Sequence, residues 1–323
     1  MAKNITRKMM HKELRNIGSI ARLFTRKVSL KRYKSLQKAQ ITLFKGKNPS
    51  RDVMTDKEIY LNDLRVLVYE PVKKVENAIG LLWLHGGGYL NGLPEQESEY
   101  FKKYLLATGC VVFAPDYTLS LEKPYPQALN EAYATLKYMV ENAEEYGINT
   151  DQIFIGGLSA GGGLAAGLSL YARDQGEINI AFQMPLYPML DDRMITESSK
   201  DNDAPIWTSK ANRFAWNRYL GDLAGTDDVP IYAAPARAID YTNLPPTLTF
   251  VGGLDLFKDE IINYVEELMK AGIEVQFQVY HGAFHGFEVA AFWKNIAQSA
   301  NDYTLEGFKY AAENYFKPQP KWH

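Results

Sequence analysis

The chain has 323 residues, of which 46% are apolar and 23% charged, and its formal net charge is −2. This composition excludes a disordered chain, a collagen and a small disulfide-stapled protein. The near-neutral charge excludes a protein that binds nucleic acid over its whole surface. The longest apolar stretch, Ala78 to Leu84, falls well short of the ~18 residues of a membrane span. We therefore expect a soluble, globular protein.

The first 38 residues form a basic arm with twelve Lys or Arg, one acid (Glu13) and a net charge of +11. Its apolar residues recur at helical spacing: Met10, Leu14, Ile17, Ala21, Phe24 and Val28. Basic residues interrupt the apolar core that a secretory signal would need: Arg22, Arg26 and Lys27. We expect a basic helix that packs over the acidic remainder of the chain as part of a lid. The alternatives are a helix that contacts a membrane surface or another anionic partner through residues 1–38, and an organellar transit peptide.

After about residue 60, short apolar runs alternate with helical segments. The runs are mostly continuous, as in strands covered on both faces: Leu64–Tyr69, Ile79–Leu84, Val111–Ala114, Ile153–Gly157, Ile180–Tyr187, Leu248–Val251 and Val275–Tyr280. The clearest helix runs from Gln127 to Tyr146 and is stopped by Gly147. This alternation predicts an α/β fold with a mostly parallel sheet and helices on both faces. Residues 191–230 contain no strand-like run. We therefore expect this segment to leave the sheet as an excursion that is helical around Ser209–Leu220.

The single cysteine, Cys110, lies in one of these apolar runs. We expect a buried, unreactive thiol, because a reactive thiolate needs a nearby cation and some exposure. A chain without an internal disulfide suits a reducing compartment, and the expected location is the cytoplasm.

The segment from Gly157 to Gly161 reads G-x-S-x-G, directly after a predicted strand and before a predicted helix from Leu164. A serine on such a sharp strand-to-helix turn needs strained backbone angles, and small neighbours leave room for them. The turn lifts the hydroxyl clear of the sheet, and the following helix N-terminus favours negative charge. A Gly-rich structural turn is the alternative, but the context favours Ser159 as a nucleophile.

A second glycine-rich loop, His85–Tyr89, follows the predicted strand Ile79–Leu84. Three consecutive glycines cost chain entropy, so we expect their amides to point at a ligand atom. In acyl transfer that atom is the oxyanion of the tetrahedral intermediate. The amide of Ala160, next to the nucleophile, would be a further donor. For His85 itself we expect a structural role in holding the loop.

A base and an orienting acid are needed to activate a serine, and two candidates follow later strands. Asp255 lies just beyond Leu248–Val251, and His285 just beyond Val275–Tyr280. In a parallel sheet both emerge at the edge where Ser159 emerges. The chain order of nucleophile, acid and histidine is that of α/β-hydrolases. Asp259 and Glu260 are better suited to the first turn of the following helix. A metal site at His281 and His285 is disfavoured, because Gly282 and Gly286 argue against a helix there and no third ligand cluster appears.

The chain from about residue 60 to 300 resembles the hormone-sensitive-lipase-like carboxylesterases, bacterial branch, of the α/β-hydrolase fold. His85–Gly88 resembles that family's oxyanion motif, and Ser159–Gly162 its nucleophile elbow. The three other motifs occur in the family's order: Asp116-Tyr117 with Pro124–Ala128, similar to D-Y-R-L-A-P…P-F-P-A; Asp255–Glu260, similar to D-P-L-R-D-E; and His285–Phe287, which matches H-G-F.

This resemblance implies a serine carboxylesterase that hydrolyses short- to medium-chain acyl esters through an acyl-enzyme intermediate, without metal or cofactor. The implied triad is Ser159, Asp255 and His285, and the implied oxyanion donors are the amides of Gly87, Gly88 and Ala160. It further implies a helical cap formed by residues 1–50 and 191–230 on a core formed by residues 51–190 and 231–323, and often a homodimer.

The departures from the family pattern concern supporting positions. The family usually has Asp immediately before the nucleophile, where an acid would support the loop, and this chain has Leu158. The D-Y-R-L-A-P segment differs at three further positions: Thr118, Ser120 and Leu121. We therefore expect the triad chemistry to be kept and the anchoring of these loops to differ.

The substrate pocket and the exact reaction stay open. Aromatic residues of the loop and the excursion are candidate pocket walls, although such residues also pack inward: Tyr89, Trp207, Phe214 and Trp216. The expected partner is a small-molecule ester and not a nucleic acid. An amidase, arylformamidase or peptidase would use the same triad, and a non-catalytic small-molecule binding protein would use the same scaffold.

Overall fold

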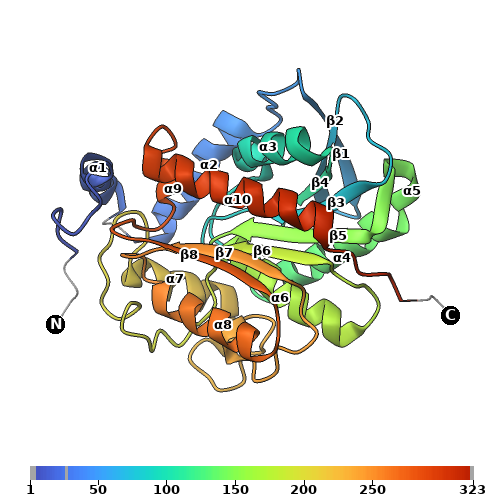
Figure 1. Ribbon diagram of the computed structural model, residues 1–323. Helices are drawn as coiled ribbons and strands as arrows, with labels where there is room; N and C mark the ends of the chain where they lie inside the picture. Colours follow the sequence, from blue (N-terminus) through green and yellow to red (C-terminus); the bar gives the residue numbers. More distant parts are fainter. Residues whose placement is uncertain (1–4, 26–27, 321–323) are drawn as a thin grey trace.

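The fold was analysed in a computed structural model that describes residues 5–25 and 28–320 (Figure 1). Residues 1–4 and 26–27 of the predicted basic arm lie outside the described residues. No helix in the described ranges has the length and apolar run needed to cross a bilayer.

The core is one eight-stranded sheet in the order β1-β2-β4-β3-β5-β6-β7-β8. β2 pairs antiparallel with β1 and with β4, and the remaining neighbours pair parallel. The prediction of a mostly parallel sheet is therefore confirmed. The strands are β1 (Met54–Leu61), β2 (Leu64–Pro71), β3 (Ala78–Leu84), β4 (Val111–Pro115), β5 (Ile148–Leu158), β6 (Phe182–Leu186), β7 (Thr247–Gly252) and β8 (Val275–Tyr280).

Helices cover both faces of the sheet (Figure 1). One face carries α3 (Ser98–Thr108) and α10 (Asn295–Asn314), and the other carries α4 (Gln127–Glu141), α6 (Ala160–Gln175) and α8 (Lys258–Lys270). β3, and β5 from Ile153 onward, are buried between these layers and read as apolar runs, as expected of strands without a solvent face. The remaining elements are α1 (Arg15–Thr25), α2 (Leu30–Phe44), α5 (Ala143–Tyr146), α7 (Ser209–Leu220), α9 (Phe287–Ala290), η1 (Pro94–Glu97), η2 (Gly221–Leu223) and η3 (Pro235–Arg237).

The seven predicted strands are present, and the prediction lacked β1. This strand is polar, with the sequence MTDKEIYL and alternating exposure, because it lies at the sheet edge and has one covered face. The predicted helix from Gln127 to Tyr146 is divided into α4 and α5 at Asn142. Gly147 ends it with a left-handed backbone, φ +67°, in the conformation that glycine adopts most readily.

The basic arm forms two helices instead of one continuous stripe. α2 begins at a new N-cap, where the Ser29 side chain accepts from the Arg32 amide, as N-cap serines do. Met10 and Leu14 are buried in the core. Arg22 pairs with Asp203 at 3.3 Å, so the arm contacts the 191–230 excursion.

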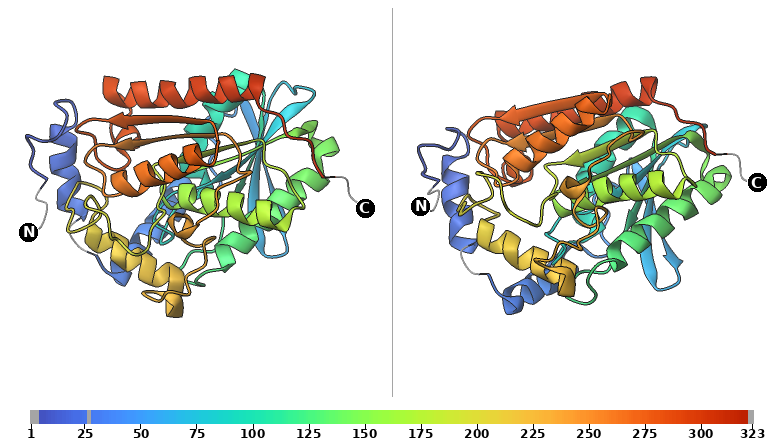
Figure 2. Two further views of the ribbon diagram at one scale, coloured as in Figure 1. Left: turned by 60° about the horizontal axis from the view of Figure 1, so that its bottom comes forward. Right: turned by 90° about the horizontal axis from the view of Figure 1, so that it is seen from below.

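α2 and α7 lie side by side (Figure 2). The Tyr33 ring of α2 stacks on the Phe214 ring of α7, with centroids 5.6 Å apart. α2 also contacts the loop after β3, because Gln37 exchanges two hydrogen bonds with the backbone of Gly92, at 2.9 and 3.2 Å. The arm, the excursion and the glycine-rich loop therefore meet in one place.

Candidate active site

Ser159 occupies the turn between β5 and α6 with φ +56° and ψ −116°. This conformation is strained for a residue with a side chain, and tight packing enforces it. A Cβ on Gly161 would lie 2.0 Å from the carbonyl oxygen of Leu84, so only glycine lets α6 start this close to the end of β3. The turn therefore holds the Ser159 side chain above the sheet edge.

Three side chains from separate strand ends converge at this edge. His285 Nε2 lies 2.8 Å from Ser159 Oγ, and His285 Nδ1 lies 2.7 Å from Asp255 Oδ2. The second oxygen of Asp255 accepts from the Phe257 amide at 3.0 Å, which fixes the carboxylate. All three residues are buried, with 7%, 5% and 1% of Ser159, His285 and Asp255 exposed. The geometry allows a proton to pass from the serine to the imidazole while the carboxylate orients the ring.

Aromatic rings surround His285. Tyr187 and Phe257 meet its ring edge-on at centroid distances of 5.1 and 5.2 Å. Trp207 of the excursion lies 6.4 Å away. These rings restrict the imidazole and keep water from its carboxylate partner, and exclusion of water strengthens electrostatic interactions inside the site.

The glycine-rich loop after β3 packs against the start of α6, because a Cβ on Gly161 would lie 2.5 Å from the carbonyl oxygen of His85. Gly87 and Gly88 have φ +124° and +64°, and a Cβ on Gly88 would lie 2.3 Å from the Trp207 ring. Within the described ranges neither amide donates to a backbone carbonyl. Ala160 is the first residue of α6, where helix amides have no intrahelical acceptor. Three amides are thus available near the elbow.

His85 holds this loop in place. Its ring stacks on Tyr117 with centroids 4.1 Å apart, and its Nδ1 lies 2.8 Å from the Gly86 carbonyl oxygen. The Tyr117 hydroxyl donates to the His85 carbonyl oxygen at 2.7 Å. Burial lowers the pKa of His85, which favours the neutral form of the ring. These contacts agree with the structural role expected from the sequence.

The candidate pocket residues lie in different surroundings. Trp207 lies against Gly88, next to His285. Tyr89 is buried, with its ring stacked on Tyr219 of α7 at 3.8 Å, and Trp216 lies 6.5 Å from it. Phe214 contacts Tyr33 of the arm. Of these four candidates, Trp207 is the one with contacts both to the loop and to the histidine.

Two buried acids behind the site were missed by sequence reasoning. Glu97 accepts from the Gly86 amide at 2.7 Å and from the Trp83 indole, and burial raises its pKa to about 8. Glu288, three residues after His285, accepts from the hydroxyls of Tyr187 and Tyr100 at 2.5 and 3.1 Å. Burial raises its pKa as well. Glu288 stands beside the His285–Phe287 motif, whereas Glu97 lies in no recognised motif, and in neither case does the sequence reveal the partners.

Two other features lie apart from this edge. Cys110 is fully buried, and desolvation raises the pKa of its thiol to about 12, which agrees with an unreactive cysteine. Among the described residues, no three His, Cys, Asp or Glu form a group that could hold a metal ion.

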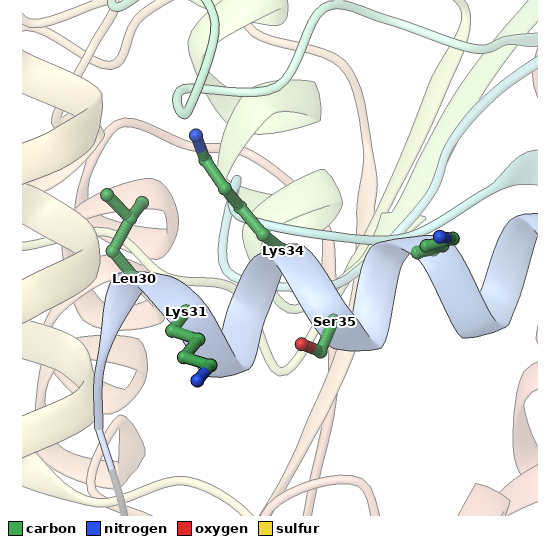
Figure 3. A pocket seen from close by; sticks show the side chains of 5 residues that line it. Leu30, Lys31, Lys34 and Ser35 are labelled. Carbon is green, nitrogen blue, oxygen red and sulfur yellow. The ribbon is translucent and has the colours of Figure 1, made fainter.

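A shallow hollow of about 450 Å³ lies on α2, away from the triad (Figure 3). Leu30 and Lys34 point to one side of the helix, and Lys31 and Ser35 to the other. Lys38 completes the lining. This hollow belongs to the basic arm.

Comparisons with known proteins identify similar sequences and structures. Residues 81–289 match a family model described as the α/β-hydrolase fold. The esterase LipI of Mycobacterium tuberculosis is 32% identical over 208 residues, which are 64% of this chain and 65% of LipI. The chain thus spans just under two thirds of that relative. The carboxylesterase NlhH of the same species is 30% identical over 230 residues, covering 70% of this chain and 72% of NlhH. A solved bacterial heroin esterase superposes with a TM-score of 0.86 at 32% identity, over 94% of this chain and 98% of that one.

Proposed function

Because the chain belongs to the α/β-hydrolase family, within the hormone-sensitive-lipase-like carboxylesterases, we propose that it is a serine carboxylesterase with Ser159, His285 and Asp255 as its triad. The observation that carries the proposal is the pair of contacts on His285, 2.8 Å to the serine oxygen and 2.7 Å to the aspartate. Both ring nitrogens are thereby committed, one to the nucleophile and one to the orienting acid.

In the first half-reaction, His285 Nε2 takes the proton of Ser159 Oγ as this oxygen attacks the ester carbonyl. Asp255 accepts from Nδ1–H and stabilises the imidazolium that forms. The carbon–oxygen bond to the leaving alcohol then breaks, and the imidazolium returns its proton to that alcohol. The product left on the enzyme is an acyl ester of Ser159.

The second half-reaction repeats these steps with water. His285 deprotonates a water molecule that attacks the acyl-enzyme, and the proton passes to Ser159 as the carboxylic acid leaves. In both halves, negative charge develops on the former carbonyl oxygen. We assign the amides of Gly87, Gly88 and Ala160 to bind it. The support for this assignment is that, among the described residues, the amides of Gly87 and Gly88 donate to no backbone carbonyl, and that Ala160 is the first residue of α6.

Short- to medium-chain acyl esters are the proposed substrates. Trp207 restricts the space above Gly88, and the triad is buried under the excursion, which suits a small acyl group better than a long one. The substrate-contacting residue that we infer from this is Trp207. Tyr89 and Phe214 each stack one ring face on a neighbour, Tyr219 and Tyr33 respectively, so less of each ring is available to a substrate.

For the basic arm we propose a role in a cap built from residues 1–50 and 191–230. The stacking of Tyr33 on Phe214 and the pairing of Arg22 with Asp203 support it. We also propose that the outer surface of the arm contacts anionic membrane surfaces. Exposed Ile20 and Leu23 on α1, together with the lysines of α2, combine apolar and basic groups as interfacial helices do. A homodimer and a cytoplasmic location stay predictions.

The test of the proposed function is the hydrolysis of p-nitrophenyl acetate and butyrate. We expect turnover by the wild-type protein and a loss of at least about 10⁴-fold in Ser159→Ala, because triad members act as a unit. Ser299→Ala, an exposed serine, is the matched control and should keep wild-type activity. Equal hydrolysis by wild type and Ser159→Ala would overturn the proposal.

The alternatives are separated by substrate. A panel of matched esters and amides with the same acyl group and leaving group should give a higher kcat/KM for the esters. A preference for the amides would favour an amidase, arylformamidase or peptidase. Saturable binding of these compounds without turnover by the wild-type protein would favour a binding protein.

A further inference from the structure

The glycine-rich loop is anchored at its first amide by a carboxyl group. Gly86 N–H donates to Glu97 Oε1 at 2.7 Å, and the other oxygen of Glu97 accepts from the indole of Trp83. Glu97 ends η1, is 8% exposed, and has no part in the triad. Its two hydrogen bonds therefore join Trp83, near the end of β3, to Gly86 at the start of the glycine-rich loop.

The residue before the nucleophile faces the same glycine. A Cβ built on Gly86 would lie 3.5 Å from Leu158 Cβ and 3.5 Å from Glu97 Oε1. The side chains at positions 158 and 97 thus approach Gly86 together, but leucine has no atom that can accept a hydrogen bond. A carboxyl group at 158 would compete for the amide that Glu97 holds.

We propose that Glu97 is a positioning residue for the oxyanion donors, and that it supplies from η1 the support that a carboxylate at position 158 would give. This inference rests on the proposed function. It names the group that keeps the amides of Gly87 and Gly88 aligned with the reacting carbonyl.

The physical reason is that the donor loop has little rigidity of its own. Glycines have wide conformational freedom, whereas donors lower a barrier only when they are held in place before the reaction. The contacts of His85 and Tyr117 fix carbonyl groups of the loop, and within the described ranges Glu97 is the acceptor for the Gly86 amide. Without it this partly buried N–H would lose its partner in the protein, and we expect the loop to lose its alignment.

The first test replaces Glu97 with leucine. We expect Glu97→Leu to lower kcat on p-nitrophenyl butyrate roughly tenfold, less than the ~10²–10³-fold for loss of a whole donor, with KM changed less than twofold. Inhibition by an aryl trifluoromethyl ketone, which forms a tetrahedral adduct with the serine, should weaken by a similar factor. Glu97→Gln keeps one acceptor oxygen, so its kcat and inhibitor affinity should lie between those of the wild type and of Glu97→Leu. The exposed Glu99→Gln, two residues along the chain, is the control and should match wild type.

The second test moves the carboxyl group to the other side of Gly86. In the Glu97→Leu background, Leu158→Asp should restore a large part of the lost kcat and of the inhibitor affinity. In the wild-type background the same change should lower kcat, because two carboxyl groups would compete for one N–H. Leu158→Asp should therefore raise kcat when residue 97 is leucine and lower it when residue 97 is glutamate. This reversal is expected if both carboxyl groups bind the same Gly86 N–H.

A purely structural role for Glu97 predicts a different result. Glu95, two residues earlier, is equally buried but binds Arg65 at 2.6 Å and the Gly46 amide at 2.8 Å. Glu95→Gln should therefore lower the melting temperature without weakening the inhibitor. If Glu97→Leu and Glu97→Gln behave in that way, or if Leu158→Asp acts equally in both backgrounds, the inference is wrong. Failure of the proposed function would be seen separately, as equal hydrolysis by wild type and Ser159→Ala.

Discussion

The indole ring of Trp207 lies directly on the backbone of Gly88. A Cβ at residue 88 would stand 2.3 Å from the ring, a separation that no real Cβ contact allows. The two residues are more than a hundred positions apart in the chain, one in the loop after β3 and the other just before α7. The glycine-rich loop and the excursion therefore share one packed interface, so a change on either side should affect the other.

Gly88→Ala is predicted to abolish most of the activity. The new methyl group would require both a left-handed backbone at φ +64° and displacement of Trp207, so the amide of residue 88 would turn away. We expect kcat/KM to fall about 10²–10³-fold, as for loss of an oxyanion donor. Gly176→Ala is the matched control, because it has a similar φ of +68° and open space around it. It should cost ~1 kcal/mol of unfolding free energy and leave kcat/KM unchanged.

Trp207→Ala is predicted to change the preference for acyl-chain length. Removal of the ring opens the space above Gly88, so longer acyl groups gain room. The ratio of kcat/KM for p-nitrophenyl octanoate to that for the acetate should rise roughly tenfold. Trp293→Ala removes an exposed indole and should leave the ratio unchanged. A constant ratio in both variants would show that Trp207 does not line the acyl pocket.

Stability should fall as the pH rises from about 5 to 8. Burial raises the pKa of Glu97 from 4.5 to about 8, so between these values the folded chain keeps a proton that the unfolded chain releases. Because the folded state binds one more proton than the unfolded state in this range, the free energy of unfolding decreases as the pH rises. The decrease is up to ~1.4 kcal/mol per pH unit for one such group. The Glu97→Gln variant cannot titrate there and should show a flatter profile in urea titrations at pH 5.5, 6.5 and 7.5. Parallel profiles for wild type and variant would contradict this assignment, and Glu99→Gln should follow wild type.

Gln37→Ala tests the link between the arm and the donor loop. The variant loses both hydrogen bonds to Gly92, worth together about 1–3 kcal/mol, and we expect a lower kcat because the loop loses its support from α2. Ser35→Ala, an exposed residue on the same helix, should keep full activity. The measurement is ester hydrolysis by the two full-length variants. Equal kcat values would mean that α2 covers the loop without holding it.

Charge reversal on α2 tests the proposed membrane contact. Exposed lysines contribute roughly 1 kcal/mol each near an anionic surface, so replacing Lys31, Lys34 and Lys38 together with Glu should abolish co-flotation with phosphatidylserine-containing vesicles. Hydrolysis of a soluble ester should be unchanged, since these three side chains are exposed and none belongs to the triad. Wild-type protein that does not float with such vesicles, or that floats equally with pure phosphatidylcholine, would contradict the proposal.

Much of the fold could be predicted because strands in the interior of the sheet are recognisable in the sequence as apolar runs. Continuous apolar runs such as Leu81–Leu84 are typical of strands with both faces covered. The parallel arrangement brings the carboxyl ends of the strands together, which placed Ser159, Asp255 and His285 at one end of the sheet. β1 was not predicted because it is an outermost strand with charged, partly exposed side chains, so its sequence contains no long apolar run. The division of α4 from α5 at Asn142 depends on local geometry that a helical repeat does not encode.

The supporting groups of the site could not be predicted for a different reason. Nothing in the sequence Pro94-Glu95-Gln96-Glu97 distinguishes one acid from the other, yet Glu95 binds Arg65 and Glu97 binds the amide of Gly86. Their roles depend on which neighbour each meets after the chain folds. The same holds for Trp207, whose position over Gly88 follows from the path of the excursion and not from a motif.

The two hydrogen bonds between Gln37 and Gly92 limit how a substrate can enter. If access required α2 to swing outward, every turnover would detach the helix from the loop that presents the amides, and the site would lose its alignment at the moment of binding. We therefore expect the entrance to open through rearrangement around Trp207 while α2 stays seated. Tethers or crosslinks that immobilise α2 on the body should then leave the rate of acylation intact.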